Sequence, residues 1–167
     1  MIGLLFGLLL ISPERKIMPQ IDFYHLTQSE VDAALVMLVQ KCLLAGKKVL
    51  VQCPRPAAEA IDDALWCTEP DSWIPHGLDD APGSEEAPVW ITSDPAKRQI
   101  EAEFLFLLHG AEREDMASFE RVFNLFDGRS EAQVGQARGQ WAALRGQADT
   151  QMRYFAQDEA GKWEQRA

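Results

Sequence analysis

A short apolar run, KVLVQC, spans residues 48–53 between two segments with helical spacing, and this order limits the folds open to the chain. Before it, from Thr27 to Gly46, apolar residues recur three and four positions apart, as on the buried face of a helix. After it, Pro56 can open a second helix, because a proline in the first helical turn loses no backbone hydrogen bond. A continuous apolar strand between two helices is typical of a parallel sheet that is covered on both faces.

The remaining segments predict an α/β domain in which strands and helices alternate. The first helix is expected to begin at the capping box formed by Thr27 and Glu30, and the second to end before Pro70. We favour a strand over a short helix for the run RVFNLF, and we expect a last helix from about Ser130 to Gly146. The strands predicted in addition to residues 48–53 are 21–26, 89–92, 104–108, 121–126 and a final edge strand near Met152. This order predicts a single open, mostly parallel sheet with helices on its faces.

The distribution of charge argues against direct binding to DNA. The chain has 167 residues and a net charge of −10, and 47% of its residues are hydrophobic, as in an ordinary globular domain. Ten of its 26 acidic residues lie between Pro56 and Ala96, where there is no Lys or Arg, so the rest of the chain holds 16 charges of each sign. An acidic central segment repels phosphate, and we therefore expect no broad, non-specific contact with a duplex.

The first eleven residues, MIGLLFGLLLI, are apolar but too few to span a bilayer, which takes about 20 apolar residues. A signal peptide would carry its positive charges before the apolar run, whereas Arg15 and Lys16 follow it. We interpret residues 1–17 as an apolar extension and expect translation to start at Met18. A membrane anchor is the alternative interpretation. The expected location is the cytoplasm, without a membrane.

No sequence motif indicates a cofactor or a metal. The segments after the first two strands, TQSE and CPRPAAE, are not rich in the glycines that a phosphate-binding loop needs. His25, His76 and His109 lie far apart and offer no pair of metal ligands on one helix face. Three cysteines without a C-x-x-C motif argue against zinc and against a disulfide framework, and indicate a reducing compartment.

One catalytic arrangement can be drawn from the sequence. Cys53 and His25 both lie at the carboxyl ends of predicted strands, where open α/β sheets bind their ligands. They are the basis of an alternative hypothesis, a small cysteine-dependent hydrolase or transferase. A lone cysteine that closes an apolar strand is, however, usually a core residue, and we favour a protein without catalytic residues.

Two groups of aromatic and basic residues suggest surfaces that bind partners. Trp66 and Trp73 flank a turn, where they form either an exposed anchor for a partner or part of the core. Arg138, Trp141 and Arg145 follow one another at i, i+3 and i+7, along one face of the last helix. This helix has either a buried tryptophan with solvated arginines or a site for a carboxylate beside an aromatic side chain.

Five segments of the chain together resemble the chi subunit family of bacterial DNA polymerase III, over roughly residues 19–147: IDFYHL, GKKVLVQC, AIDDALWCTEPDSWIPHGL, APVWIT and ARGQWAALR. The order of ALW, a short spacer and WIPH is the most specific part. The resemblance implies a Rossmann-like fold without a nucleotide, in a non-catalytic accessory subunit of the clamp-loader complex. Its implied partners are the C-terminal tail of single-stranded DNA-binding protein and the psi subunit, or another clamp-loader subunit.

The resemblance also assigns residues to these partners. Arg138 and Trp141 match the basic and aromatic positions that receive the tail, with tryptophan in place of the usual tyrosine, and Phe126 and Arg145 are added to this site. Trp66 and Trp73 match the surface that faces psi. A lysine that the family places early in the last helix is replaced by Gln133 or Val134. The domain boundaries that follow are 1–17 for the extension, 18–147 for the chi-like domain, and 148–167 for a poorly matched tail that includes the possible edge strand.

Overall fold

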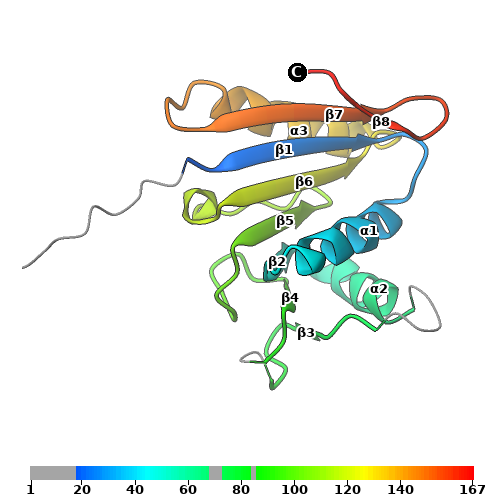
Figure 1. Ribbon diagram of the computed structural model, residues 1–167. Coiled ribbons are helices and arrows are strands. Elements are labelled where there is room, and N and C mark those ends of the chain that lie inside the picture. Colours follow the sequence, from blue (N-terminus) through cyan, green and yellow to red (C-terminus); the bar gives the residue numbers. More distant parts are fainter. Residues whose placement is uncertain (1–17, 68–72, 84–85) are drawn as a thin grey trace, which may run out of the picture.

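The computed structural model describes residues 18–67, 73–83 and 86–167 of the chain. Over these ranges it contains eight strands, three α-helices and one 3-10 turn, which alternate along the first half of the chain (Figure 1). In chain order they are β1 (Gln20–Leu26), α1 (Val31–Leu44), β2 (Val49–Gln52), α2 (Arg55–Trp66), β3 (His76–Leu78), β4 (Val89–Thr92), β5 (Phe104–Leu108), η1 (Met116–Ser118), β6 (Arg121–Asp127), α3 (Glu131–Leu144), β7 (Gln151–Gln157) and β8 (Trp163–Gln165).

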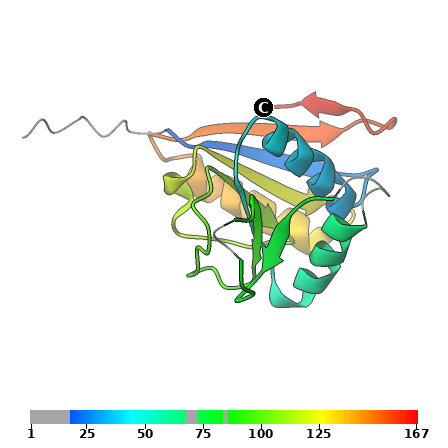
Figure 2. The same cartoon turned by 60° about the horizontal axis from the view of Figure 1, so that its bottom comes forward.

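All eight strands belong to one open sheet in the order β3-β4-β2-β5-β6-β1-β7-β8. Every neighbouring pair is parallel except β7 and β8, which are antiparallel. Helices α1 and α2 cover one face of the sheet and α3 covers the other (Figures 1 and 2). The predicted α/β architecture, an open and mostly parallel sheet flanked by helices, is therefore confirmed.

Alternation along the strands divides the core into two layers. In β2, Val49 and Val51 pack with α1 and α2, whereas Leu50 belongs to the layer under α3. In β1, Tyr24 and Leu26 face α1, whereas Ile21 and Phe23 face α3. Because side chains alternate between faces, His25 lies on the α3 side together with Phe23. This placement of β1 determines which residues can reach the site described below.

The predicted capping box at Thr27 and Glu30 is wrong. Helix α1 begins at Val31, and Glu30 is its N-cap residue without a side-chain capping bond. The side-chain oxygen Oε1 of Gln157 instead accepts hydrogen bonds from the backbone N–H groups of Thr27, Gln28 and Ser29, at 3.2, 3.0 and 3.0 Å. A residue of β7, 128 to 130 positions away, satisfies these donors, so the segment after β1 stays a loop and the helix starts later.

The position of the last predicted strand also differs from the expectation. The segment around Met152 does form a strand, but β7 is not at the edge, because β8 pairs with its outer side. Backbone pairing continues past β8, where the N–H of Tyr154 donates to the carbonyl of Ala167 at 2.8 Å. The short strand β3 was not predicted either. Its Gly77 lies so close to the Trp90 ring that no Cβ would fit there.

Candidate functional site

A cavity of about 330 Å³ lies between α3 and the carboxyl-terminal halves of β1, β6 and β7. Four of its lining residues come from α3 at positions i, i+3, i+4 and i+7, which is the spacing of one helix face. The others come from three adjacent strands and from the segment after β8. The lining residues are His25, Phe126, Val134, Ala137, Arg138, Trp141, Tyr154 and Ala167.

The sheet side of the cavity is aromatic, and strand register positions it. His25 and Phe126 are direct partners of the parallel β1–β6 pair, and their rings stack with centroids 5.0 Å apart. Trp141 packs edge-on against the buried ring of Phe23 at 5.2 Å and against Tyr154 at 5.9 Å. The indole is therefore half-buried: the sheet fixes it from one side, and it forms a wall of the cavity on the other.

Arg138 contributes a cation to this apolar cavity. Its side chain is exposed at the rim, and none of the ion pairs found in the described part of the chain involves it. A guanidinium binds a carboxylate through two parallel hydrogen bonds, and Val134 and Trp141 provide an apolar surface beside it. The arrangement suits a ligand that combines a carboxylate with an apolar or aromatic group.

His25 and Tyr154 form a polar pair in the wall of the cavity. The Tyr154 hydroxyl lies 2.7 Å from His25 Nδ1, within hydrogen-bond distance. Burial lowers the pKa of His25 and the nearby Arg138 lowers it further, although the backbone of Gly128 and the carboxylate of Asp127 oppose the shift. Burial raises the pKa of Tyr154. At neutral pH both side chains are therefore uncharged.

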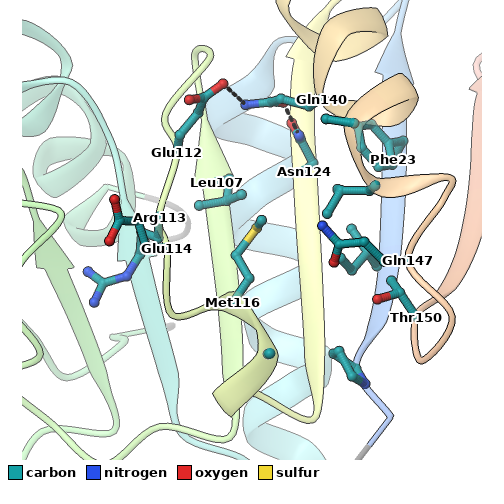
Figure 3. A pocket seen from close by; sticks show the side chains of 15 residues that line it. Phe23, Leu107, Glu112, Arg113, Glu114, Met116, Asn124, Gln140, Gln147 and Thr150 are labelled. Carbon is teal, nitrogen blue, oxygen red and sulfur yellow. Dashed lines mark hydrogen bonds between the residues drawn. The ribbon is translucent and has the colours of Figure 1, made fainter.

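A second cavity, of about 420 Å³, lies on the other side of α3, above β1, β5 and β6 (Figure 3). Three of its polar side chains are joined by hydrogen bonds: the Asn124 amide donates to Gln140 Oε1 at 2.6 Å, and the Gln140 amide donates to Glu112 at 3.2 Å. Among the described residues that line it, Arg113 is the cation, and it is buried and paired with Asp115. Its guanidinium is therefore already occupied, whereas Arg138 at the first cavity is exposed.

Comparisons with known proteins decide the family. The family model described as DNA polymerase III chi subunit, HolC, matches residues 18–152. The chain belongs to the DNA polymerase III chi subunit family. It is 31% identical over 129 residues to the DNA polymerase III subunit chi of Haemophilus influenzae, covering 74% of this chain and 88% of the relative. It is 28% identical over 86 residues to the probable chi subunit of Rickettsia prowazekii, covering 51% of this chain and 52% of the relative.

Membership in the chi family makes the chain an accessory subunit of a replicative polymerase complex and implies other subunits as partners. The family resemblance inferred from the sequence is thereby confirmed. Over the part of the chain that the structure describes, no helix has the length and apolar character to cross a membrane. Residues 1–17, interpreted above as an apolar extension, lie outside the described residues.

Three of the four residues assigned to the tail site in this chi-family chain meet in the first cavity: Phe126, Arg138 and Trp141. Arg145 does not line it; it is the exposed residue that follows the last turn of α3. Of the two positions considered for the missing lysine, Val134 faces the cavity, whereas the Gln133 side chain accepts from the backbone N–H of Asp127 at 3.0 Å. Arg138 therefore lines the cavity, but of the two positions considered for the second cation, a lysine in the family pattern, the one that faces the cavity is occupied by the apolar Val134.

Four further lining residues were not predicted as contacts of the tail, although Val134 was considered as the position of the missing lysine: His25, Val134, Ala137 and Tyr154. Val134 and Ala137 could have been found from the helical spacing around Arg138. His25 and Tyr154 required knowledge that β7 pairs with β1, and no local sequence pattern encodes this pairing.

The two tryptophans of the second assigned surface also come together. Trp66, at the end of α2, and Trp73, before β3, stack with ring centroids 6.3 Å apart. Both are exposed, by 51% and 65%, so they are not core residues. The Trp66 ring also rests on His76, whose Nε2 lies 3.1 Å from a carboxylate oxygen of Asp62. The pair forms an exposed aromatic patch on the α2 side of the sheet, several strands away from the strands that line the α3 cavity.

The structure does not bring Cys53 and His25 together. Two strands, β5 and β6, lie between β2 and β1, and the two side chains belong to opposite layers of the core. Cys53 is fully buried, and burial raises the pKa of its thiol to about 12, which opposes the thiolate that a nucleophile needs. The alternative of a cysteine-dependent enzyme thus lacks its site. Among the described residues, no group of three or more His, Cys, Asp or Glu side chains is placed to hold a metal ion.

Proposed function

We propose that this chi-family chain is a non-catalytic accessory subunit that links the clamp-loader complex to the C-terminal tail of single-stranded DNA-binding protein in the cytoplasm. The observation that carries the proposal is the α3 cavity, in which the exposed Arg138 lies beside an apolar wall formed by Trp141, Val134 and Phe126. The family resemblance supplies the partner, and the chemistry of the cavity agrees with it: the guanidinium binds the terminal carboxylate and the apolar wall receives the adjacent side chain.

The charge of the chain supports an indirect link to DNA. With a net charge of −10, the chain as a whole repels phosphate, whereas its exposed Arg138 attracts an acidic peptide locally. A partner that is already bound to single-stranded DNA would bring such a peptide to the cavity. Since the contact depends on one exposed arginine, it should be moderate in affinity and weakened by salt.

Calorimetric titration with a synthetic peptide that copies the last ten or so residues of the organism's own single-stranded DNA-binding protein tests the proposal. We expect binding that weakens with added salt and is lost when the peptide's terminal carboxylate is amidated. Arg138→Ala should lower the affinity at least about tenfold, as expected for a charge-assisted hydrogen-bonded pair. Arg145→Ala is the matched control, because it removes the same charge from the same helix outside the cavity. Equal losses in both variants, or no binding by the unmodified chain, would contradict the proposal.

We further propose that the Trp66–Trp73 patch binds the psi subunit or another clamp-loader subunit. Exposed, stacked tryptophans supply a large apolar surface, and tryptophan is enriched among the residues that dominate binding at protein interfaces. Trp66→Ala and Trp73→Ala should weaken co-purification with that subunit while leaving the tail peptide bound with normal affinity. Leu44→Ala, at an exposed apolar position on α1, is the control.

A further inference from the structure

We propose that His25 and Tyr154 form a proton-coupled donor in the wall of the α3 cavity, which takes up one proton when a carboxylate ligand binds. The inference rests on the proposed function, because the ligand is the carboxylate-bearing peptide. It adds two residues to the binding site and predicts how the affinity of the site depends on pH.

The free site presents Tyr154 as an acceptor. The Nε2 side of the His25 ring faces the backbone of Gly128 so closely that a Cβ at Gly128 would collide with it. Nε2 itself has no hydrogen-bond partner among the described residues, so the hydrogen bond of the ring is the one between Nδ1 and the Tyr154 hydroxyl. A phenol hydroxyl is a stronger donor than a neutral imidazole N–H, which favours the tautomer with its proton on Nε2. Nδ1 is then the acceptor, and the Tyr154 hydroxyl donates its proton to Nδ1 across 2.7 Å. The cavity meets only the lone pairs of the Tyr154 oxygen, which repel a carboxylate.

Protonation of His25 reverses this hydrogen bond. With protons on both ring nitrogens, Nδ1 donates to the Tyr154 oxygen, and the hydroxyl proton can turn toward the cavity. A carboxylate held by Arg138 would then gain a second donor from the sheet side. The proton comes from solvent, and the balance is one proton bound to His25 for each carboxylate ligand bound.

The charges around His25 determine the pH at which its ring becomes protonated. Arg138 on α3 and burial disfavour the charged ring, whereas Asp127 on β6 favours it, and the Tyr154 side chain on β7 is neutral. An incoming carboxylate neutralises the field of Arg138 and adds a negative charge near the ring, so the pKa of His25 must rise on binding. Because the ligand-bound state holds more protons than the free state, affinity should increase as the pH falls between the bound and the free pKa values.

Calorimetry of the tail peptide at pH 5.5, 6.5 and 7.5, in two buffers with different heats of ionisation, measures both affinity and proton uptake. We expect tighter binding at lower pH, by at most about tenfold per pH unit, which is the limit for one proton. Tyr154→Phe removes the hydroxyl and keeps the ring, so the gain in affinity between pH 7.5 and pH 5.5 should become smaller; the part that remains is the effect of the carboxylate's charge on His25. NMR titration of the His25 ring, assigned with His25→Gln, should show a pKa that rises when the peptide is added.

The outcomes separate this inference from the proposed function. Binding with the same affinity at every pH and no net proton uptake, or an unchanged pH dependence in Tyr154→Phe, would overturn the inference and leave the tail site standing. No binding at any pH would overturn both. Urea unfolding of each variant at pH 7.5 shows whether a loss of binding reflects a loss of folding.

Discussion

The side-chain oxygen of Gln157 accepts a hydrogen bond from the backbone N–H of Ser29 at 3.0 Å, across 128 residues of sequence. The same oxygen accepts from Thr27 and Gln28, and the Gln157 amide donates to Ser29 Oγ at 2.8 Å. In dinucleotide-binding folds, the N–H groups between the first strand and its helix hold a phosphate. Here the neutral side chain of Gln157 accepts hydrogen bonds from these N–H groups. Strand β7 therefore both pairs with β1 and holds the loop that follows β1.

Replacing Gln157 with alanine should destabilise the protein by about 1–3 kcal/mol, because three backbone donors lose their acceptor in a partly buried position. The free energy of unfolding in urea measures the effect. Gln151→Ala, at the exposed start of the same strand, is the control and should change stability by less than about 0.5 kcal/mol. A similar small value for Gln157→Ala would mean that the loop does not depend on this contact.

Local sequence patterns suffice for some of the strands but not for the start of α1. Residues 89–92 and 104–108 form strands with the predicted bounds, since short apolar runs between turns depend on nearby residues only. The predicted capping box did not form, and Gln157, from the other end of the chain, accepts from the backbone N–H of Thr27, which the Glu30 side chain was expected to bind.

The same distinction applies to the α3 cavity. Arg138 and Trp141 could be found from helical spacing and from the family resemblance, since they lie on one helix. His25 and Tyr154 come from strands that pair across 129 residues, and the position of β7 inside the sheet was not predicted. The part of the cavity that depends on long-range pairing is therefore the part that sequence reasoning missed.

Thiol reactivity should distinguish the three cysteines. Cys67 is exposed, whereas burial raises the thiol pKa of Cys42 to about 11 and that of Cys53 to about 12. Since the thiolate is the reactive form, a chromogenic disulfide reagent at pH 7.5 should label one thiol quickly and two only after unfolding. Cys67→Ser should remove the fast phase. A fast reaction at Cys53 would restore the hypothesis of a cysteine-dependent enzyme.

The free energy of unfolding should decrease as the pH is lowered, partly because of His25. Burial lowers the pKa of this ring below its ordinary value of 6.5. As the pH drops through 6.5, the unfolded chain binds a proton that the folded chain does not, so folding loses up to about 1.4 kcal/mol per pH unit until the folded pKa is reached. Urea unfolding between pH 7.5 and 5.5 should show a smaller loss in His25→Gln than in the unmodified chain. Parallel curves would show that His25 titrates normally in the folded protein.

Asp22 should be the most costly charged side chain to replace among the described residues. Its carboxylate is completely buried, and each of its oxygens accepts from Arg153 on β7, with Nε at 2.7 Å and Nη2 at 2.8 Å. Arg121 on β6 also donates to it at 2.7 Å, so one carboxylate joins three adjacent strands. Asp22→Asn would leave two guanidiniums facing each other without a counter-charge. Both guanidiniums belong to side chains that are 30% exposed and can partly turn to water, so we expect a loss near the lower end of the roughly 3–5 kcal/mol for a broken buried pair.

Asp80→Asn provides the contrast, because Asp80 pairs with Lys97 at 2.6 Å but is 75% exposed. An exposed pair contributes less than about 1 kcal/mol, so urea unfolding should separate the two variants clearly. The Asp22 variant should also lose affinity for the tail peptide, since Arg153 precedes Tyr154 and holds that end of β7 against β1. If Asp22→Asn were no less stable than Asp80→Asn, the two arginines would not need the carboxylate between them, and backbone pairing alone would hold β7 in the sheet.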